Sequence, residues 1–183
     1  LAAVAATGAA FAQSSVTLYG VADASIAKIT DASTALSSAG VMNNGNSRWG
    51  VRGTEDLGGG MSAGFTFEQG LSLNDGSLAK SGGGEFGRGA YMTLAGGFGE
   101  LSLGRRLNPA FNAAAAWELT GTANYSAGLS QFGAALGGLR ENSMIMYTSP
   151  AMSGFTVQFG HVLKGNNTTT NKASNDLSLR YAG

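Results

Sequence analysis

Two arginines stand four residues apart in the stretch SRWGVRGTEDLGGG (Ser47 to Gly60), which ends in three glycines. Arg48 and Arg52 are therefore the first side chains to consider for chemistry. A phosphate-binding loop, a nucleic-acid-binding patch and the wall of a water-filled pore would each use such residues. The segments that follow the arginines, and the composition of the chain, distinguish these three interpretations.

The phosphate-loop interpretation fails because the three glycines are followed by a strand pattern. A phosphate cradle needs the N-terminus of a helix at that point, and the lysine of a Walker motif is missing from the stretch. The nucleic-acid interpretation fits poorly with a formal net charge of zero. The sequence therefore predicts no nucleic-acid partner.

Catalytic and metal-binding residues are scarce. The chain has no cysteine and a single histidine, His161, whereas metal sites and nucleophilic triads need several partners. Glu55 and Asp56 are adjacent acids at an expected tight turn, where contact with solvent or a cation is favoured over acid–base catalysis. The sequence predicts no cofactor, no metal and no enzymatic activity.

The elements that carry the arginines have a period of two. Segments such as VTLYGVADASIA and GFTVQFGHVL alternate apolar and polar residues, which is typical of strands with one apolar and one polar face. We therefore expect an all-β chain. The expected strands lie near residues 16–27, 47–55, 61–72, 86–95, 100–106, 143–149, 154–163 and 176–182.

The breaks between these strands alternate in length. Short turns such as DLGGG and GGFG alternate with longer polar segments. The chain as a whole is also poor in charge, since 12% of its residues are charged against a usual share of roughly 25%. No apolar run reaches the ~18 residues of a transmembrane helix. Tight turns on one rim and long loops on the other are typical of a transmembrane antiparallel β-barrel.

One connection is much longer than the others. Residues 107–139 form a 33-residue segment whose single charged side chain is Glu118. A loop of that length usually has a function of its own. Within it, residues 108–119 have a helical pattern, with Pro109 as a first-turn residue.

The N-terminal segment LAAVAATGAAFA is apolar, rich in small residues, and ends in an Ala-x-Ala sequence. This pattern is typical of the end of a secretory signal peptide. We expect residues 1–12 to be a signal-peptide remnant and Gln13 to begin the mature chain. An exported protein without cysteine is compatible with the envelope of a Gram-negative bacterium.

Four segments together resemble the general porins of Gram-negative bacteria, in the form typical of beta-proteobacteria. They are QSSVTLYGVAD, SRWGVRGTEDLGGGMSAGF, FGRGAYMTLAGGFGELSLGR and NSMIMYTSPAMSGFTVQFG, in that order. The resemblance covers nearly all of residues 13–183. It implies a trimeric 16-stranded barrel in the outer membrane, with a passive pore in each subunit.

The resemblance also implies a domain plan. Residues 13–183 would be the N-terminal half of the barrel, with about eight of its strands, and residues 107–139 would fold inward as the constriction loop. The sequence would thus be a fragment. The implied partners are membrane lipid and lipopolysaccharide, two further copies of the chain, and small hydrophilic solutes and ions.

Strand alternation assigns several polar side chains to the water-facing side, because a mid-depth arginine facing hydrocarbon costs about 2–4 kcal/mol. Trp49 and Val51 share one face of their strand, and the arginines take the other. The polar side chains expected on the inner face are Tyr19, Asp23, Arg48, Arg52, Glu68 and Arg180.

The resemblance adds further candidates for the narrowest part of the pore. Arg48, Arg88 and Arg140 look like positions where related porins place basic pore-lining residues, and Glu68 resembles an acid that faces them. Glu118 is the one acid on the expected constriction loop. Alternation alone does not fix the direction of Arg88.

These residues predict a diffusion channel with a mild preference for anions, because arginines on the wall would face a loop with few acids. Two alternatives remain open. An outer-membrane barrel enzyme would have to use His161 as its base, and a structural or adhesive barrel would have a plugged lumen. Large, stepwise single-channel conductance would distinguish the diffusion channel from the enzyme and from the plugged barrel.

Overall fold

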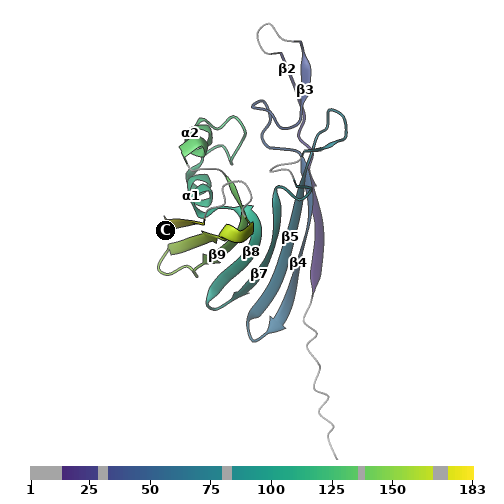
Figure 1. The fold of residues 1–183 in the computed structure, drawn as a ribbon. Helices are drawn as coiled ribbons and strands as arrows, with labels where there is room; N and C mark the ends of the chain where they lie inside the picture. Colours follow the sequence, from purple (N-terminus) through teal and green to yellow (C-terminus); the bar gives the residue numbers. More distant parts are fainter. Residues whose placement is uncertain (1–13, 29–32, 80–83, 136–138, 167–172) are drawn as a thin grey trace, which may run out of the picture.

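The fold is that of a computed structural model, which describes residues 14–28, 33–79, 84–135, 139–166 and 173–183 (Figure 1). The expected signal-peptide remnant, residues 1–12, lies outside the described residues. The long strands are β1 (Ser15–Val21), β4 (Arg48–Gly58), β5 (Met61–Leu71), β7 (Gly89–Gly96), β8 (Gly99–Leu107), β9 (Arg140–Thr148), β10 (Phe155–Val162) and β11 (Ser174–Tyr181).

These strands form one curved antiparallel sheet in the order β1-β4-β5-β7-β8-β9-β10-β11. A short strand, β6 (Leu78–Ala79), also pairs with β5. Within the described residues, β1 pairs only with β4 and β11 only with β10, so the sheet does not close on itself there. The all-β expectation and its set of main strands are confirmed.

The registers show which residues share each face. Across β1, β4 and β5, Leu18 lies opposite Val51, which lies opposite Phe67. One position along the strands, Tyr19 lies opposite Gly50, which lies opposite Glu68. Apolar and polar rows therefore alternate across the sheet, as paired strands require.

The apolar rows are the exposed ones. Leu18, Met92 and Leu103 keep 74%, 62% and 52% of their surface accessible, although they lie in the middle of strands. A water-soluble protein rarely leaves such a continuous apolar band uncovered, whereas a barrel wall presents one to lipid.

Tight turns join strands at one end of the sheet, the lower end in Figure 1. Between β4 and β5, Gly58, Gly59 and Gly60 have φ angles of 79°, 63° and 78°. These are left-handed conformations that glycine adopts without a steric penalty. The Asp56 carboxylate accepts a hydrogen bond from the Gly58 N–H (2.8 Å), which fixes the start of the turn.

The expected strand 16–27 is wrong in its second half. β1 ends at Val21, and Ser25–Ala27 forms β2, which pairs with β3 (Ala35–Ser37) in a separate hairpin. The backbone N–H of Asp23 donates to Ser47 Oγ (2.9 Å) rather than to a strand, so the chain leaves the sheet there. The hairpin projects beyond the end of the sheet opposite the tight turns (Figure 1).

The long connection contains two helices, α1 (Pro109–Trp117) and α2 (Ala127–Ala135), on the concave side of the sheet (Figure 1). The first was expected from the sequence, and the second was not. Asn108 caps α1 by accepting the Phe111 N–H at 2.8 Å, and Pro109 occupies the first turn. A 3-10 helix, η2 (Lys164–Asn166), follows β10.

The buried core lies beneath α1, on the inner face of β9 and β10. Met144 and Met146 are 1% and 0% exposed, and Val162 joins them. A Cβ added at Gly160 would lie 3.1 Å from Pro109 Cδ, which shows how closely α1 rests on this wall. No helix among the described residues is long and apolar enough to span a membrane.

Candidate functional site

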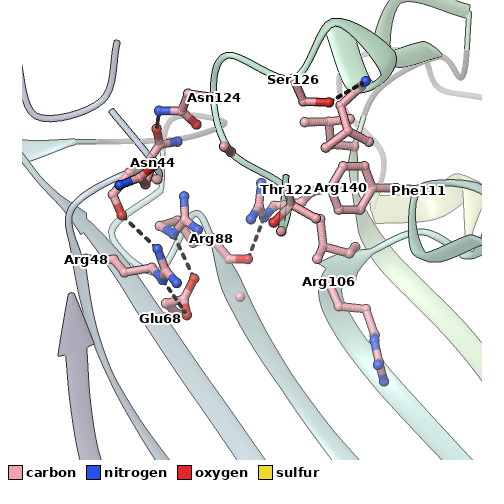
Figure 2. Close-up of a pocket in the computed structure, with 18 of the residues that line it drawn as sticks. Asn44, Arg48, Glu68, Arg88, Arg106, Phe111, Thr122, Asn124, Ser126 and Arg140 are labelled. Atoms are coloured by element: carbon pink, nitrogen blue, oxygen red, sulfur yellow. Dashed lines mark hydrogen bonds and ion pairs between the residues drawn. The ribbon is translucent and has the colours of Figure 1, made fainter. Parts of the chain in front are cut away.

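A cavity of about 750 Å³ lies on the inner face of the sheet, between its strands and the long connection (Figure 2). β1, β4, β5, β7, β8 and β9 contribute one wall. Residues 44–46, in the loop that precedes β4, and residues 121–130 of the long connection contribute the facing wall, and Arg88, Phe111 and Leu139 complete the lining.

A carboxylate holds the centre of the strand wall. Glu68 Oε1 accepts a hydrogen bond from Arg88 Nε at 2.7 Å, and Glu68 Oε2 lies 3.7 Å from Arg48 Nε. The Tyr19 hydroxyl donates to the same Oε2 at 3.1 Å. Glu68 thus holds three side chains from β1, β4 and the segment before β7 in one group. Figure 2 shows Arg48 and Arg88 beside Glu68.

Backbone carbonyls orient the surrounding guanidinium groups. Arg48 Nη1 donates to the Asn46 carbonyl (2.9 Å), and Arg140 Nε donates to the Arg88 carbonyl (2.7 Å). Arginine donors with fixed acceptors present their remaining N–H groups in defined directions. The arginines of β4 and β9 are therefore held at set positions around the cavity.

The cavity wall carries an excess of positive charge. Four arginines line it, and Glu68 is the one acid that does so among the described residues. Four positive charges and one negative charge leave an excess of three positive charges. In water a unit charge about 6 Å away contributes about 0.7 kcal/mol, which corresponds to roughly threefold in local ion concentration. The lining arginines are Arg48, Arg88, Arg106 and Arg140.

The facing wall adds no ionised group among its described lining residues. Glu118, the expected acid of the loop, does not line the cavity. Its carboxylate accepts the N–H groups of Thr120 and Thr122, each at 2.8 Å, and the Ser126 hydroxyl at 2.9 Å. Glu118 thus shapes the bend after α1.

The structure brings five expected residues to the cavity wall: Tyr19, Arg48, Glu68, Arg88 and Arg140. Arg52 lies on the same face of the sheet as Tyr19 and Glu68, in the next row of residues. Its guanidinium carbon is 5.4 Å from the centre of the Tyr19 ring. Arg180 lies opposite Thr156 on β10, away from this cavity, and its Nε is buried with no hydrogen-bond partner among the described residues.

Asp23 does not lie on the inner face of a strand, because β1 ends before it. Its carboxylate accepts the Asn43 side-chain amide at 2.7 Å and the Gly45 N–H at 3.0 Å. The hydrogen bond from Asn43, followed by that from Gly45, holds the pKa of Asp23 below its ordinary value. The placement of Asp23 with Tyr19 on the inner wall was wrong, and its observed position is inside the loop.

Arg106 was missed as a lining residue, although the sequence carries a signal for it. It alternates in phase with Glu100 and Ser102 on β8, and this phase is the signal that could have identified it as an inner-face residue. Its Nη1 donates to Glu100 Oε1 at 3.0 Å, and its guanidinium carbon lies 4.6 Å from the centre of the Tyr91 ring.

The asparagines at positions 44, 46 and 124 were also missed as lining residues. They lie in irregular segments, which carry no periodic pattern, so the sequence holds no comparable signal for them. The described residues contain no group of three His, Cys, Asp or Glu side chains placed to hold a metal ion. The arginines of the site can attract and orient anions in water.

A curved antiparallel sheet with an apolar exterior, a basic interior and an inward-folded connection defines the wall of a transmembrane β-barrel. Residues 1–182 match the family described as Gram-negative porin. The chain belongs to this family.

Two curated relatives are similar to this chain. Outer membrane porin protein 32 of Delftia acidovorans is 40% identical over 172 residues, covering 88% of this chain and 47% of the relative. An outer membrane porin protein of Bordetella pertussis is 34% identical over 175 residues, covering 87% of this chain and 45% of the relative. The chain spans about half the length of both. These relatives place the protein in the outer membrane.

Solved structures agree with the fold. The anion-selective porin from Comamonas acidovorans has a TM-score of 0.76 at 30% identity, covering 93% of this chain and 54% of that one. A trimer form of OmpT from Vibrio cholerae has a TM-score of 0.63 at 16% identity, covering 92% and 47%, and shows a likeness of fold alone. The relatives are porins, which are not enzymes.

Proposed function

We propose that the complete protein forms a water-filled channel for passive diffusion of ions and small hydrophilic solutes across the outer membrane. One observation carries the proposal: a cavity of about 750 Å³, lined by four arginines, lies on the inner side of a sheet whose outer side is apolar. A barrel wall that encloses water requires this division of faces.

The channel prefers anions mildly. Arg48, Arg88, Arg106 and Arg140 bias the ions that enter, because the described part of the facing loop contributes no acid to the cavity wall. The similar porin from Comamonas acidovorans is named as anion-selective, which supports the same preference here. Arg52 and Arg180 would line the pore away from the narrow part, and Tyr19 and Glu68 would orient the arginines.

The domain plan remains part of the proposal. Residues 1–12 would be the signal-peptide remnant, residues 13–183 the N-terminal half of a 16-stranded barrel, and residues 107–139 its constriction loop. The contacts of α1 with β10 and β11 support an inward path for that loop. The protein would work as a homotrimer among membrane lipid and lipopolysaccharide, since one relative of the same fold is described in a trimer form.

No observation on the described residues favours a barrel enzyme or a plugged structural barrel over the channel. His161 Nδ1 lies 2.8 Å from Asn175 Oδ1 and faces the exposed apolar row with Ile145, where no described carboxylate orients it. An enzyme with His161 as its base would need such a group. A plugged barrel would fill the space that the arginines line. We infer that the protein is not an enzyme.

Planar bilayer recording of the complete protein tests the function. Stable stepwise conductance in a salt gradient, with a reversal potential on the anion side, is the expected result. Trimers that insert into the bilayer but show no conductance steps would contradict the channel function. A reversal potential on the cation side would contradict only the preference for anions.

A further inference from the structure

The long connection is anchored at two ends of the sheet. At one end, the Ala110 N–H donates to Asp176 Oδ2 (3.0 Å), and Asn112 Nδ2 donates to Gln158 Oε1 (3.2 Å). These contacts attach α1 to β10 and β11. An inward segment that was attached only there would be free to swing across the cavity.

The other end of the connection is attached to the loop that precedes β4. Asn124 Nδ2 donates to Asn46 Oδ1 at 2.7 Å and to the Gly40 carbonyl at 3.1 Å, while the Tyr125 hydroxyl donates to Asn44 Oδ1 at 3.0 Å. These three hydrogen bonds are called the loop clasp below. They join segments about eighty positions apart in sequence. Asn44, Asn46 and Asn124 line the cavity, and Figure 2 shows Asn44 and Asn124 close together.

The clasp has a rigid base. Asn43, next to its acceptor residues, is 0% exposed. Its Oδ1 accepts the hydroxyls of Ser25 (3.2 Å) and Ser37 (2.9 Å), and its Nδ2 donates to Asp23 (2.7 Å). A buried polar group with its hydrogen bonds satisfied holds the surrounding backbone in one conformation. The loop therefore offers Asn44 and Asn46 as fixed acceptors.

One residue links the clasp to the charged wall. Asn46 uses its side-chain oxygen to accept from Asn124 and its backbone carbonyl to accept from Arg48 Nη1 at 2.9 Å. The position of the inward segment and the direction of Arg48 thus depend on the same short loop.

We propose that Asn124 and Asn46 are positioning residues that set the width of the channel. Through the clasp they hold residues 121–126 at a fixed distance from the arginine wall. The inference deepens the proposed channel function and rests on it. Because the clasp side chains are uncharged, they govern which solute size passes, whereas the arginines govern which sign of charge passes.

The test uses the complete trimer in planar bilayers, with Asn124→Ala, Asn46→Ala and the double variant. Ser77→Ala is the matched control, since the exposed Ser77 hydroxyl bonds only Asp75 in the described residues. Three quantities are measured: the size cut-off for polyethylene glycols added to the bath, the open-channel current noise, and the reversal potential.

Each clasp variant should shift the cut-off to larger polymers and raise the current noise. The reversal potential should stay within error of the wild type, because every variant keeps the Asn46 backbone carbonyl that accepts from Arg48 Nη1. The double variant should shift the cut-off no further than Asn124→Ala, because that variant already removes the hydrogen bond that Asn46 Oδ1 accepts, together with the one to the Gly40 carbonyl. Tyr125→Phe, which removes one exposed hydroxyl contact, should give a smaller shift and serves if the other variants fail to assemble.

Wild-type cut-off and noise in Asn124→Ala, or in Tyr125→Phe if that variant alone assembles, would overturn the inference while channels still form. Additive shifts in the double variant would also overturn it. Failure of the wild-type trimer to conduct would instead overturn the proposed function, so the two failures are distinguishable.

Discussion

At the scale of residues, the net charge of the cavity wall depends on which acceptors its arginines use. Glu68 bonds Arg88 and Tyr19 and lies 3.7 Å from Arg48, so its charge is neutralised within the wall. Arg140 uses a backbone carbonyl instead of a carboxylate. Arg106 pairs with Glu100, which does not line the cavity, at 3.0 Å. Four lining arginines against these two carboxylates still leave a positive excess toward the water in the cavity.

Arg88→Gln in the complete protein should reduce the ratio of anion to cation permeability. Loss of one unit charge about 6 Å from the ion path in water lowers the local anion concentration roughly threefold and raises the local cation concentration roughly threefold, so the ratio should fall by up to about tenfold. Reversal potentials in a salt gradient measure it. Lys164→Gln is the control, because the exposed Lys164 carries the same charge and does not line the cavity. Equal shifts for the two variants would show that the cavity arginines have no special role.

Glu68→Gln should change selectivity in the opposite direction. It removes the one lining acid of the described wall, so the anion-to-cation permeability ratio should rise. The amide keeps a similar shape, and its one oxygen still accepts from Arg88, while its NH₂ group replaces the oxygen that accepted from Tyr19 and can donate to the Tyr19 hydroxyl. The same reversal-potential recording measures the change, and a lower ratio would contradict the assignment of Glu68 to the cavity.

At the scale of elements, alternation predicted the strands well and the loops poorly. Each of the eight expected strands has a counterpart, and the rows of Leu18 and Tyr19 face opposite sides of the sheet as expected. Period-two patterns record burial and exposure, so strands can be inferred from them.

The errors fall where a tertiary contact overrides the local pattern. Asp23 continues the alternation of β1, yet its N–H bonds Ser47, which lies far along the chain, and the strand stops. Likewise, α2 is a nine-residue helix rich in small side chains, with only a weak periodic signal in the sequence. Among the site residues, Arg88 and Arg140, which the resemblance suggested for the pore, line the cavity wall, and no pattern identified the asparagine contacts.

Acid should loosen the loop that precedes β4 only below the ordinary titration range of aspartate. The hydrogen bonds from Asn43 and Gly45 lower the pKa of Asp23 from its ordinary 3.8. A native pKa below the unfolded one contributes stability that is present above about 3.8 and is lost as the pH falls through the native value. Carboxyl carbon NMR of the labelled trimer should show a midpoint below 3.8. Asn43→Ala should raise this midpoint, and an unchanged midpoint would contradict the stated cause.

Gly104 on β8 should tolerate no side chain. Its φ is 134°, and a Cβ there would collide with the Ala90 carbonyl and lie 2.8 Å from Tyr91 Cα. Gly104→Val should destabilise the barrel by at least the ~1–3 kcal/mol of such backbone strain. Heat-modified gel migration of refolded protein measures the loss. Gly97→Val is the control, because nothing lies within 4 Å of its added Cβ. Similar melting of the two variants would contradict the argument.

At the scale of the whole molecule, the two faces of the sheet meet two solvents. The exposed row that includes Met92 and Leu103 would face hydrocarbon, while the arginine wall would face water. The sorting of side chains between the two faces, rather than any single motif, therefore marks this wall as membrane-spanning.

Leu103→Arg in the complete protein should impair membrane folding by about 2–4 kcal/mol if the residue lies near the middle of the bilayer. Ser102→Arg does not serve as a control, because Ser102 is fully buried. Thr17→Arg is the suitable control, because Thr17 is exposed and lies opposite Arg52 on the inner face. Refolding titrations into lipid vesicles with urea measure both. Equal folding of both variants would place the outer row in water.

The attachments of the long connection have a consequence for the order of assembly. Strand hairpins close over short stretches of sequence, whereas Ala110 meets Asp176 and Asn124 meets Gly40 across 66 and 84 positions. Contacts of such separation form slowly, because closing a long stretch of chain is entropically costly. A newly inserted barrel should therefore pass through a wide-bore stage and narrow only afterwards. During that interval the outer membrane would admit solutes that the finished protein excludes.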